Sequence, residues 1–172
     1  MSISTKPQTT EYAPYYERYV GLVPDGDIIE TLMQQMADTS RLLAGITEDQ
    51  ASHRYAPEKW SVKELVGHIS DSERIFAYRA LRFARGDRAE LAGFEQDGYV
   101  ANGNFDQRQL RDIALEFEHV RLASLDLFKA LSEEAWARRG VASEVEVSVK
   151  ALAWIIAGHE LHHKNVLKSK YL

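Results

Sequence analysis

Four long segments of this chain place apolar residues three or four positions apart, which is the pattern of a helix with one buried face. They span residues 27–44, 61–85, 106–131 and 148–168, and a short helical turn is expected at 132–136. Amphipathic helices of this length bury their apolar faces most completely against one another. The sequence therefore predicts an all-α fold, an antiparallel four-helix bundle.

The ends of these segments carry recognisable signals. Ser61 and Glu64 form a capping box in front of the second apolar stripe.

The stretch Val141 to Val149 alternates apolar and polar residues, but a lone short strand would have no partner. The connection from Gly86 to Phe105 is long for a compact domain, and loops of that length are usually functional or disordered. Its aromatic residues favour a segment that covers one end of the bundle.

The 172 residues fit one domain, which we expect to comprise residues 27–172. Residues 1–26 contain three prolines and four tyrosines and lack a long helical pattern. Prolines interrupt a helix, whereas tyrosines favour packing against a surface. We therefore expect an irregular N-terminal arm that lies on the domain.

Composition narrows the functional classes. The net charge is −5 without a basic block, which speaks against nucleic-acid binding. The sequence has no apolar run of membrane-spanning length and no signal-peptide pattern, so we expect a cytoplasmic protein without a membrane partner. There is no cysteine. A zinc site would therefore use histidine and carboxylate ligands, and any thiol in a reaction would have to be diffusible.

His159 and His163 lie four residues apart on the apolar stripe of the last helix, so both side chains should point into the bundle. Two imidazoles at this spacing can bind one metal ion, and they can also be buried residues that hydrogen-bond to their neighbours. The same residues spell His-Glu-x-x-His, the zincin protease signature. That family takes a third ligand downstream, whereas the nine residues after His163 contain no His, Asp, Glu or Cys. The protease interpretation is therefore set aside.

A third ligand would have to come from upstream, and His68 in the second helix is the best candidate. It can equally be a core or boundary histidine. His53 and His119 fit surface positions, whereas His162 points about 100° away from the pair and should lie beside the site or in solvent. Two acidic residues, Asp71 and Glu73, follow His68 and could orient a ligand, although a solvated charge is the commoner role for helical carboxylates. Glu160 projects off the apolar stripe and is not expected to act as a base.

Two motifs resemble the DinB-like superfamily, and within it the YfiT-type metal-dependent hydrolases and the bacillithiol S-transferases. The first motif is Trp60-Ser61-Val62-Lys63-Glu64-Leu65-Val66-Gly67-His68-Ile69-Ser70-Asp71, and the second is Gly158-His159-Glu160-Leu161-His162-His163. The resemblance rests on both motifs at this separation and covers the chain from about residue 27. After His163 the sequence departs from the YfiT pattern, which is richer in histidine there.

The resemblance implies a four-helix bundle, often a homodimer, with a divalent metal, commonly zinc or nickel, held by His68, His159 and His163. It further implies a metal-dependent thiol S-transferase or hydrolase that acts on a small molecule, with a low-molecular-weight thiol as a possible co-substrate. Two alternatives stay open at this point. The ion could be structural in a non-catalytic metal-binding or assembly protein, or the histidines could hydrogen-bond in a metal-free bundle.

Overall fold

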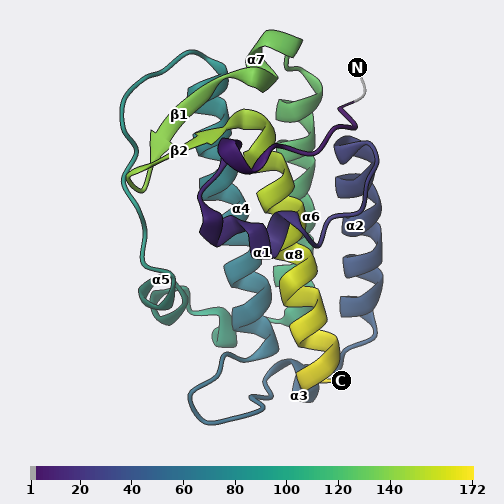
Figure 1. The fold of residues 1–172 in the computed structure, drawn as a ribbon. Helices are drawn as coiled ribbons and strands as arrows, with labels where there is room; N and C mark the ends of the chain where they lie inside the picture. The colour runs from purple at the N-terminus through teal and green to yellow at the C-terminus, as the bar shows by residue number, and fades with distance from the viewer. Residues whose placement is uncertain (1–2) are drawn as a thin grey trace.

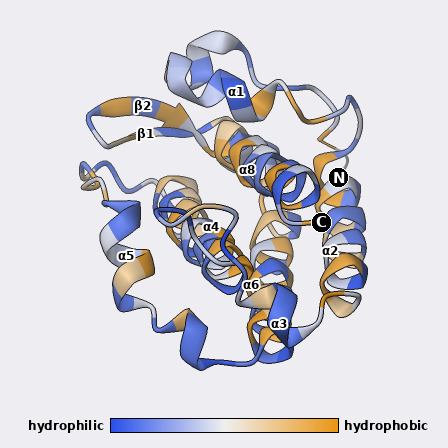
Figure 2. Cartoon of the chain, turned by 90° about the horizontal axis from the view of Figure 1, so that it is seen from below, coloured by the Kyte–Doolittle hydropathy of each residue, from blue (hydrophilic) through white to orange (hydrophobic). Residues whose placement is uncertain are grey.

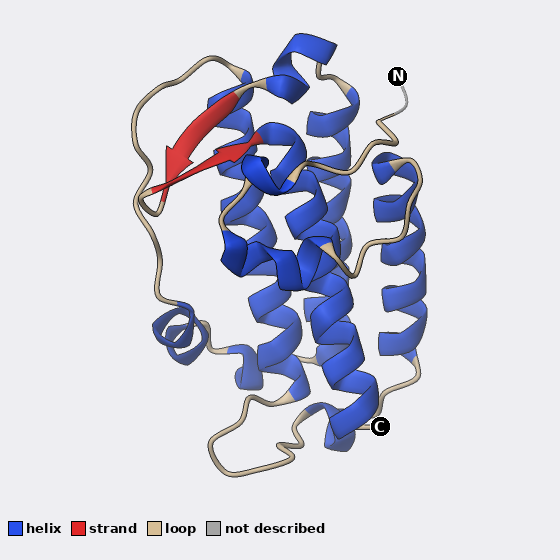
Figure 3. Ribbon diagram, viewed as in Figure 1, coloured by secondary structure: helices blue, strands red, loops and turns tan. Residues whose placement is uncertain are grey.

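Helices dominate the computed structural model of this chain, which describes residues 3–172 (Figure 3). The four longest are α2 (Ile28–Ala44), α4 (Val62–Ala84), α6 (Leu110–Lys129) and α8 (Val149–Lys170). They pack side by side, and Figure 2 shows them nearly end-on. The predicted all-α four-helix bundle is therefore confirmed.

Shorter elements connect and cover the bundle. They are η1 (Thr9–Glu11), η2 (Pro14–Tyr16), α1 (Glu17–Val20), α3 (Glu48–Ala51), α5 (Gln96–Asn102), η3 (Phe105–Gln107), α7 (Glu133–Ala137), β1 (Arg139–Ala142) and β2 (Val145–Ser148). The 86–105 connection is thus partly helical. None of the helices in the described part of the chain is long and apolar enough to cross a membrane.

The helix ends follow the local sequence closely. Ser61 caps α4 with the expected capping box, accepting a hydrogen bond from the Glu64 backbone while the Glu64 carboxylate accepts one from the Ser61 backbone. Ser148 caps α8 in the same position. The third long helix was predicted to begin near Asp106, but that residue lies in η3 and α6 begins at Leu110.

The predicted antiparallel arrangement is only partly correct, because one pair of neighbouring helices runs parallel. In Figure 1, the 86–105 connection passes from one end of the bundle to the other, so α6 starts at the same end as α4 and runs parallel to it. The contacts between α4 and α8, which run in opposite directions, are extensive. This long connection therefore brings α5 to the side of the bundle beside α4.

The alternating segment after α7 is a hairpin rather than a strand without a partner. β1 and β2 pair antiparallel, with Ala142 opposite Val145. The two turn residues, Ser143 and Glu144, have φ angles of 53° and 65°. A two-residue turn with both φ angles positive matches the right-handed twist of the flanking strands. Neither residue is the usual Asn or Gly, which is why the sequence did not reveal the turn.

The N-terminal arm packs across the outer face of α8 (Figure 1). Tyr12, Tyr19 and Val20 are buried there. The approach is close because residue 158 is glycine: a Cβ atom at Gly158 would lie 2.1 Å from the Tyr19 carbonyl oxygen. As a result the arm covers the turn of α8 that carries His159. Residues 1–2 of the expected arm lie outside the described residues.

Candidate metal centre

The three candidate histidines come from the two facing helices α4 and α8. His68 lies in the second turn of α4, and His159 and His163 lie one turn apart on α8. His68 and His159 are 3% and 5% exposed, whereas His163 is half-buried. The spacing on α8 and the antiparallel packing of α8 on α4 therefore place all three side chains in one layer of the bundle.

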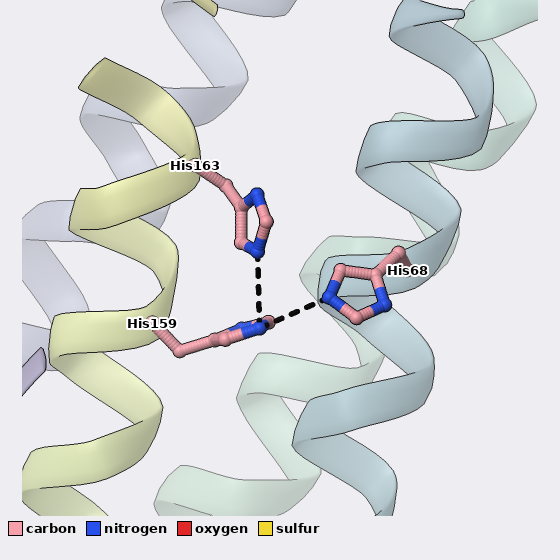
Figure 4. Close-up of side chains that lie close together, drawn as sticks. All are labelled: His68, His159 and His163. Atoms are coloured by element: carbon pink, nitrogen blue, oxygen red, sulfur yellow. Dashed lines mark hydrogen bonds between the residues drawn. The ribbon is translucent and has the colours of Figure 1, made fainter. Parts of the chain in front are cut away.

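Figure 4 shows the three rings pointing toward one another across the helix interface. The His159 Nε2 atom lies 3.1 Å from His68 Nε2 and 3.1 Å from His163 Nε2. One potential ligand atom from each histidine lies within 4.8 Å of the other two. Two nitrogens bound at about 2.0–2.1 Å to one tetrahedral zinc lie about 3.3 Å apart. The separations therefore suit a shared divalent ion.

Hydrogen bonding alone does not account for this arrangement. Each imidazole nitrogen offers either one N–H or one acceptor lone pair, directed in the plane of the ring. The His159 Nε2 atom therefore cannot form two well-directed hydrogen bonds, one to each neighbouring Nε2 atom. Among the alternatives left open by the sequence, the geometry thus favours a divalent ion over a hydrogen-bonded cluster.

The surroundings keep the three rings neutral. Burial lowers the pKa of His68 to about 4 and that of His163 to about 3. The pKa of His159 is also lowered, first by burial and then by the charges that His163 and His68 would carry if protonated. Because only neutral imidazole can bind a metal ion, all three are available as ligands at neutral pH.

Aromatic side chains surround the cluster. The Trp60 ring lies 4.7 Å from the His68 ring, and the Tyr19 ring lies 5.3 Å from the His159 ring, centroid to centroid. The Ser72 hydroxyl lies 3.5 Å from His68 Nδ1, on the side of the ring away from the other two histidines. A polar partner at the second ring nitrogen orients a histidine toward its ligand. Ser72 was not singled out by the sequence, although it lies one turn after His68.

A cavity of about 280 Å³ opens onto the cluster. His68 and His159 line it together with residues of the N-terminal arm, α4 and the segment before α5, among them Tyr19, Ser72 and Phe76. A separate hollow of about 320 Å³ reaches His163 and His162 from the side of Trp60 and Tyr171. The cluster is therefore accessible to small molecules even though most of its surface is buried.

The remaining histidines lie away from the meeting point of the three rings. His53 and His119 are exposed, as predicted. His162 is half-buried, and its ring packs against Tyr19 and His163 at centroid distances of 5.5 and 5.0 Å. It thus lies beside the site, one of the two positions expected for it.

The acidic residues behave differently from one another. Asp71 is half-buried and pairs with the exposed Arg74. Glu73 is 2% exposed, so the expectation of a solvated charge is wrong for this residue. It forms two hydrogen bonds of 2.8 Å with Arg121, which also pairs with the fully buried Glu160 at 2.7 Å. Glu160 is accordingly part of an ion-pair network in the core of the bundle and does not line the cavity.

Sequence comparison supports the assignment of the fold. Residues 31–167 match the DinB superfamily. No curated protein matches the chain in sequence.

Several solved structures resemble this one, among them these three. YfiT from Bacillus subtilis, a probable metal-dependent hydrolase with an unusual four-helix bundle topology, is 12% identical with a TM-score of 0.74, covering 96% of this chain and 93% of its own. A mycothiol-dependent maleylpyruvate isomerase is 15% identical with a TM-score of 0.64, covering 80% of this chain and 58% of its own. A DinB-like protein from Bacillus subtilis is 23% identical with a TM-score of 0.59, covering 82% and 86%. From the sequence match and the shared fold, this chain belongs to the DinB superfamily.

Proposed function

We propose that this protein is a metal-dependent enzyme in which His68, His159 and His163 bind one divalent ion, zinc or nickel. The observation that carries the proposal is the convergence of three Nε2 atoms at the edge of a cavity. YfiT, a probable metal-dependent hydrolase, and a mycothiol-dependent isomerase share the fold, which fits this proposal.

The reaction that suits this site best is thiol S-transfer or hydrolysis of a small molecule. When bound, a divalent ion lowers the pKa of a coordinated water or thiol and thereby supplies a nucleophile at neutral pH. The protein's own residues hold the site ready for this chemistry. The buried imidazoles stay unprotonated, and the rings of Tyr19 and Trp60 pack against those of His159 and His68. Because the chain has no cysteine, a thiol substrate must diffuse in.

A purely structural ion is the second candidate, since an ion between α4 and α8 would pin these helices together. Structural zinc sites are usually closed by four protein ligands, whereas catalytic sites use three and leave one position open. Among residues 3–172, the only group of three or more candidate ligands consists of these three histidines. The adjoining cavity also gives a substrate a place to bind. Both features favour catalysis.

The proposal is tested with an assay of the metal-loaded protein. Zinc- and nickel-loaded protein would be incubated with monochlorobimane as acceptor and bacillithiol, mycothiol or glutathione as thiol, and separately with p-nitrophenyl acetate and an amide substrate. We expect turnover that chelation abolishes and metal restores, that is lost in His68→Ala and that is retained in His162→Ala. Metal-loaded protein that turns over none of these substrates, yet loses its fold on chelation, would favour the structural ion instead. A cytoplasmic homodimer acting on a small molecule is part of the same proposal.

A further inference from the structure

Two arginines are buried in the bundle, and they have different partners. Arg121 is fully buried and pairs with two carboxylates, Glu73 and Glu160. Arg79 on α4 is 3% exposed, but no carboxylate of residues 3–172 lies within ion-pairing distance of it. A buried charge without a counter-charge is unfavourable, so buried guanidinium groups are normally paired. Arg79 therefore lacks the kind of partner that the same fold provides for Arg121.

The contacts that Arg79 does make hold it in place without neutralising it. Its Nη2 atom donates to the Ala92 carbonyl oxygen at 3.1 Å and to the Ser143 hydroxyl at 2.9 Å. A guanidinium has five N–H donors, and both of these bonds come from one nitrogen. The Tyr16 hydroxyl also hydrogen-bonds to the Arg79 side chain: burial raises the pKa of Tyr16, whereas the Arg79 charge and this hydrogen bond lower it. These three neutral partners use only some of the five N–H donors, so the guanidinium can still donate to a further acceptor.

Arg79 lines the same cavity as the histidine cluster. His68, Ser72, Phe76 and Arg79 follow one another at intervals of four, four and three residues, so they lie along one face of α4. The helical rise separates the ends of this row by about 16 Å, and the long arginine side chain shortens the gap. The cavity therefore has a cationic group at one end and the candidate metal ligands at the other.

The other charged groups around the cavity do not neutralise the positive charge of Arg79. Glu95 is the one carboxylate among the described lining residues, and it is exposed. Its two oxygens accept hydrogen bonds from the backbone N–H groups of Asp97 and Gly98 at the start of α5. The rings of Phe76 and Phe94 lie 5.9 Å from the guanidinium carbon and form apolar walls. The cavity thus combines a cation with aromatic surface, which suits an acid that carries an apolar body.

We propose that this cavity binds a small organic acid, whose carboxylate pairs with Arg79 while its other end reaches the histidine cluster. Arg79 is then a specificity-determining residue for the enzyme. This inference rests on the proposed function, because it takes the cluster as the reaction centre. The cavity volume of about 280 Å³ limits the ligand to a small molecule.

The test compares an acid with its neutral counterpart. Phenylacetate and phenylacetamide have the same shape, and their affinities for the metal-loaded protein are measured by titration calorimetry. We expect phenylacetate to bind and the amide to bind roughly 10- to 100-fold more weakly. Arg79→Met should weaken phenylacetate binding by a similar factor without changing the metal content, and Arg79→Lys should give an intermediate affinity. Arg85→Met is the control, because Arg85 is an exposed arginine at the C-cap of the same helix.

Several outcomes would overturn the proposal. These are equal affinities for acid and amide, no binding of either, or an Arg79→Met protein that keeps the wild-type affinity. If the Arg79 variants fold poorly, the Arg79 Nε–H resonance of the wild-type protein provides the readout, since it should shift with phenylacetate and not with the amide. Repeating the titration on chelated protein separates the two proposals. Binding that depends on Arg79 persists without metal even if the proposed function fails, whereas a carboxylate bound only to the metal disappears.

Discussion

The Arg121 guanidinium and the Glu160 carboxylate form an ion pair of 2.7 Å in which neither side chain is exposed to solvent. All four long helices take part in the surrounding network. Arg121 on α6 also bonds to Glu73 on α4 and to the Leu32 carbonyl oxygen on α2. Glu160 on α8 accepts a hydrogen bond from the Thr39 hydroxyl on α2. Because Glu160 follows His159 directly, this network fixes α8 relative to α4 at the level of the histidine cluster.

Removal of Arg121 should destabilise the whole bundle. Arg121→Met would leave two buried carboxylates without their counter-charge, and we expect the free energy of unfolding to fall by about 3–5 kcal/mol. Urea denaturation followed by circular dichroism measures the change. Arg41→Met is the matched control, because Arg41 is exposed and its ion pair with Asp38 should contribute less than about 1 kcal/mol. If the free energy of unfolding fell by a similar amount in Arg121→Met and Arg41→Met, the buried network would contribute no more to stability than an exposed ion pair.

The close contact between Gly158 and Tyr19 leads to a second prediction. Gly158→Ala should raise helix propensity, yet its Cβ atom would collide with the Tyr19 backbone and displace the N-terminal arm. We expect a net loss of about 1–3 kcal/mol, as for other overpacked sites, together with faster proteolysis of the arm. Gly45→Ala at the end of α2 is the control, since its Cβ would meet only an ordinary contact at 3.5 Å. An arm that stays protected in Gly158→Ala would contradict the close packing seen here.

Much of the fold could be predicted from the sequence because the helices are amphipathic and capped by local signals. The pairing of His159 with His163 follows in the same way from helical periodicity. Glu160 could not be placed by this reasoning, which assumes that the side of a helix opposite its apolar stripe faces solvent. The side of α8 that carries Glu160 instead faces α2 and α6, where Thr39 and Arg121 contact the carboxylate. The N-terminal arm covers the face of α8 at Gly158, so nearly every residue from Val149 to Glu160 is buried.

The buried partners of the site were missed for a related reason. The ion pairs of Arg121 join residues that are far apart in the sequence, and no local pattern marks them. The role of Arg79 depends on the 86–105 connection and on the hairpin turn at Ser143, which contains no glycine or asparagine. The position of such side chains is decided by tertiary packing rather than by periodicity.

The lowered histidine pKa values predict how the stability of the metal-free protein depends on pH. In the unfolded chain His68 titrates near 6.5, whereas burial in the folded protein lowers its pKa to about 4. Below pH 6.5 the unfolded chain therefore binds protons that the folded chain does not, and the free energy of unfolding falls as the pH decreases toward 4. Above pH 6.5 both states are neutral at this group, so its contribution is constant.

For His68 alone the expected loss is about 3 kcal/mol, since each unit of pKa shift corresponds to about 1.36 kcal/mol. Urea denaturation of chelated protein at several values between pH 7.5 and about 4.5 measures it. The variant His68→Phe should show a shallower dependence on pH. Equal slopes for wild type and variant would contradict the neutral, buried state of this histidine.

The central claim is that three histidines from α4 and α8 bind one metal ion, and metal stoichiometry tests it most directly. The protein would be expressed with zinc and nickel supplied, purified without a histidine tag and analysed by mass spectrometry of the elements. We expect about one divalent ion per chain in wild type and in His162→Ala, and less than about a tenth of an equivalent in His68→Ala. Wild-type protein that holds no stoichiometric metal, or a His68→Ala variant that keeps full occupancy, would contradict this account of the site.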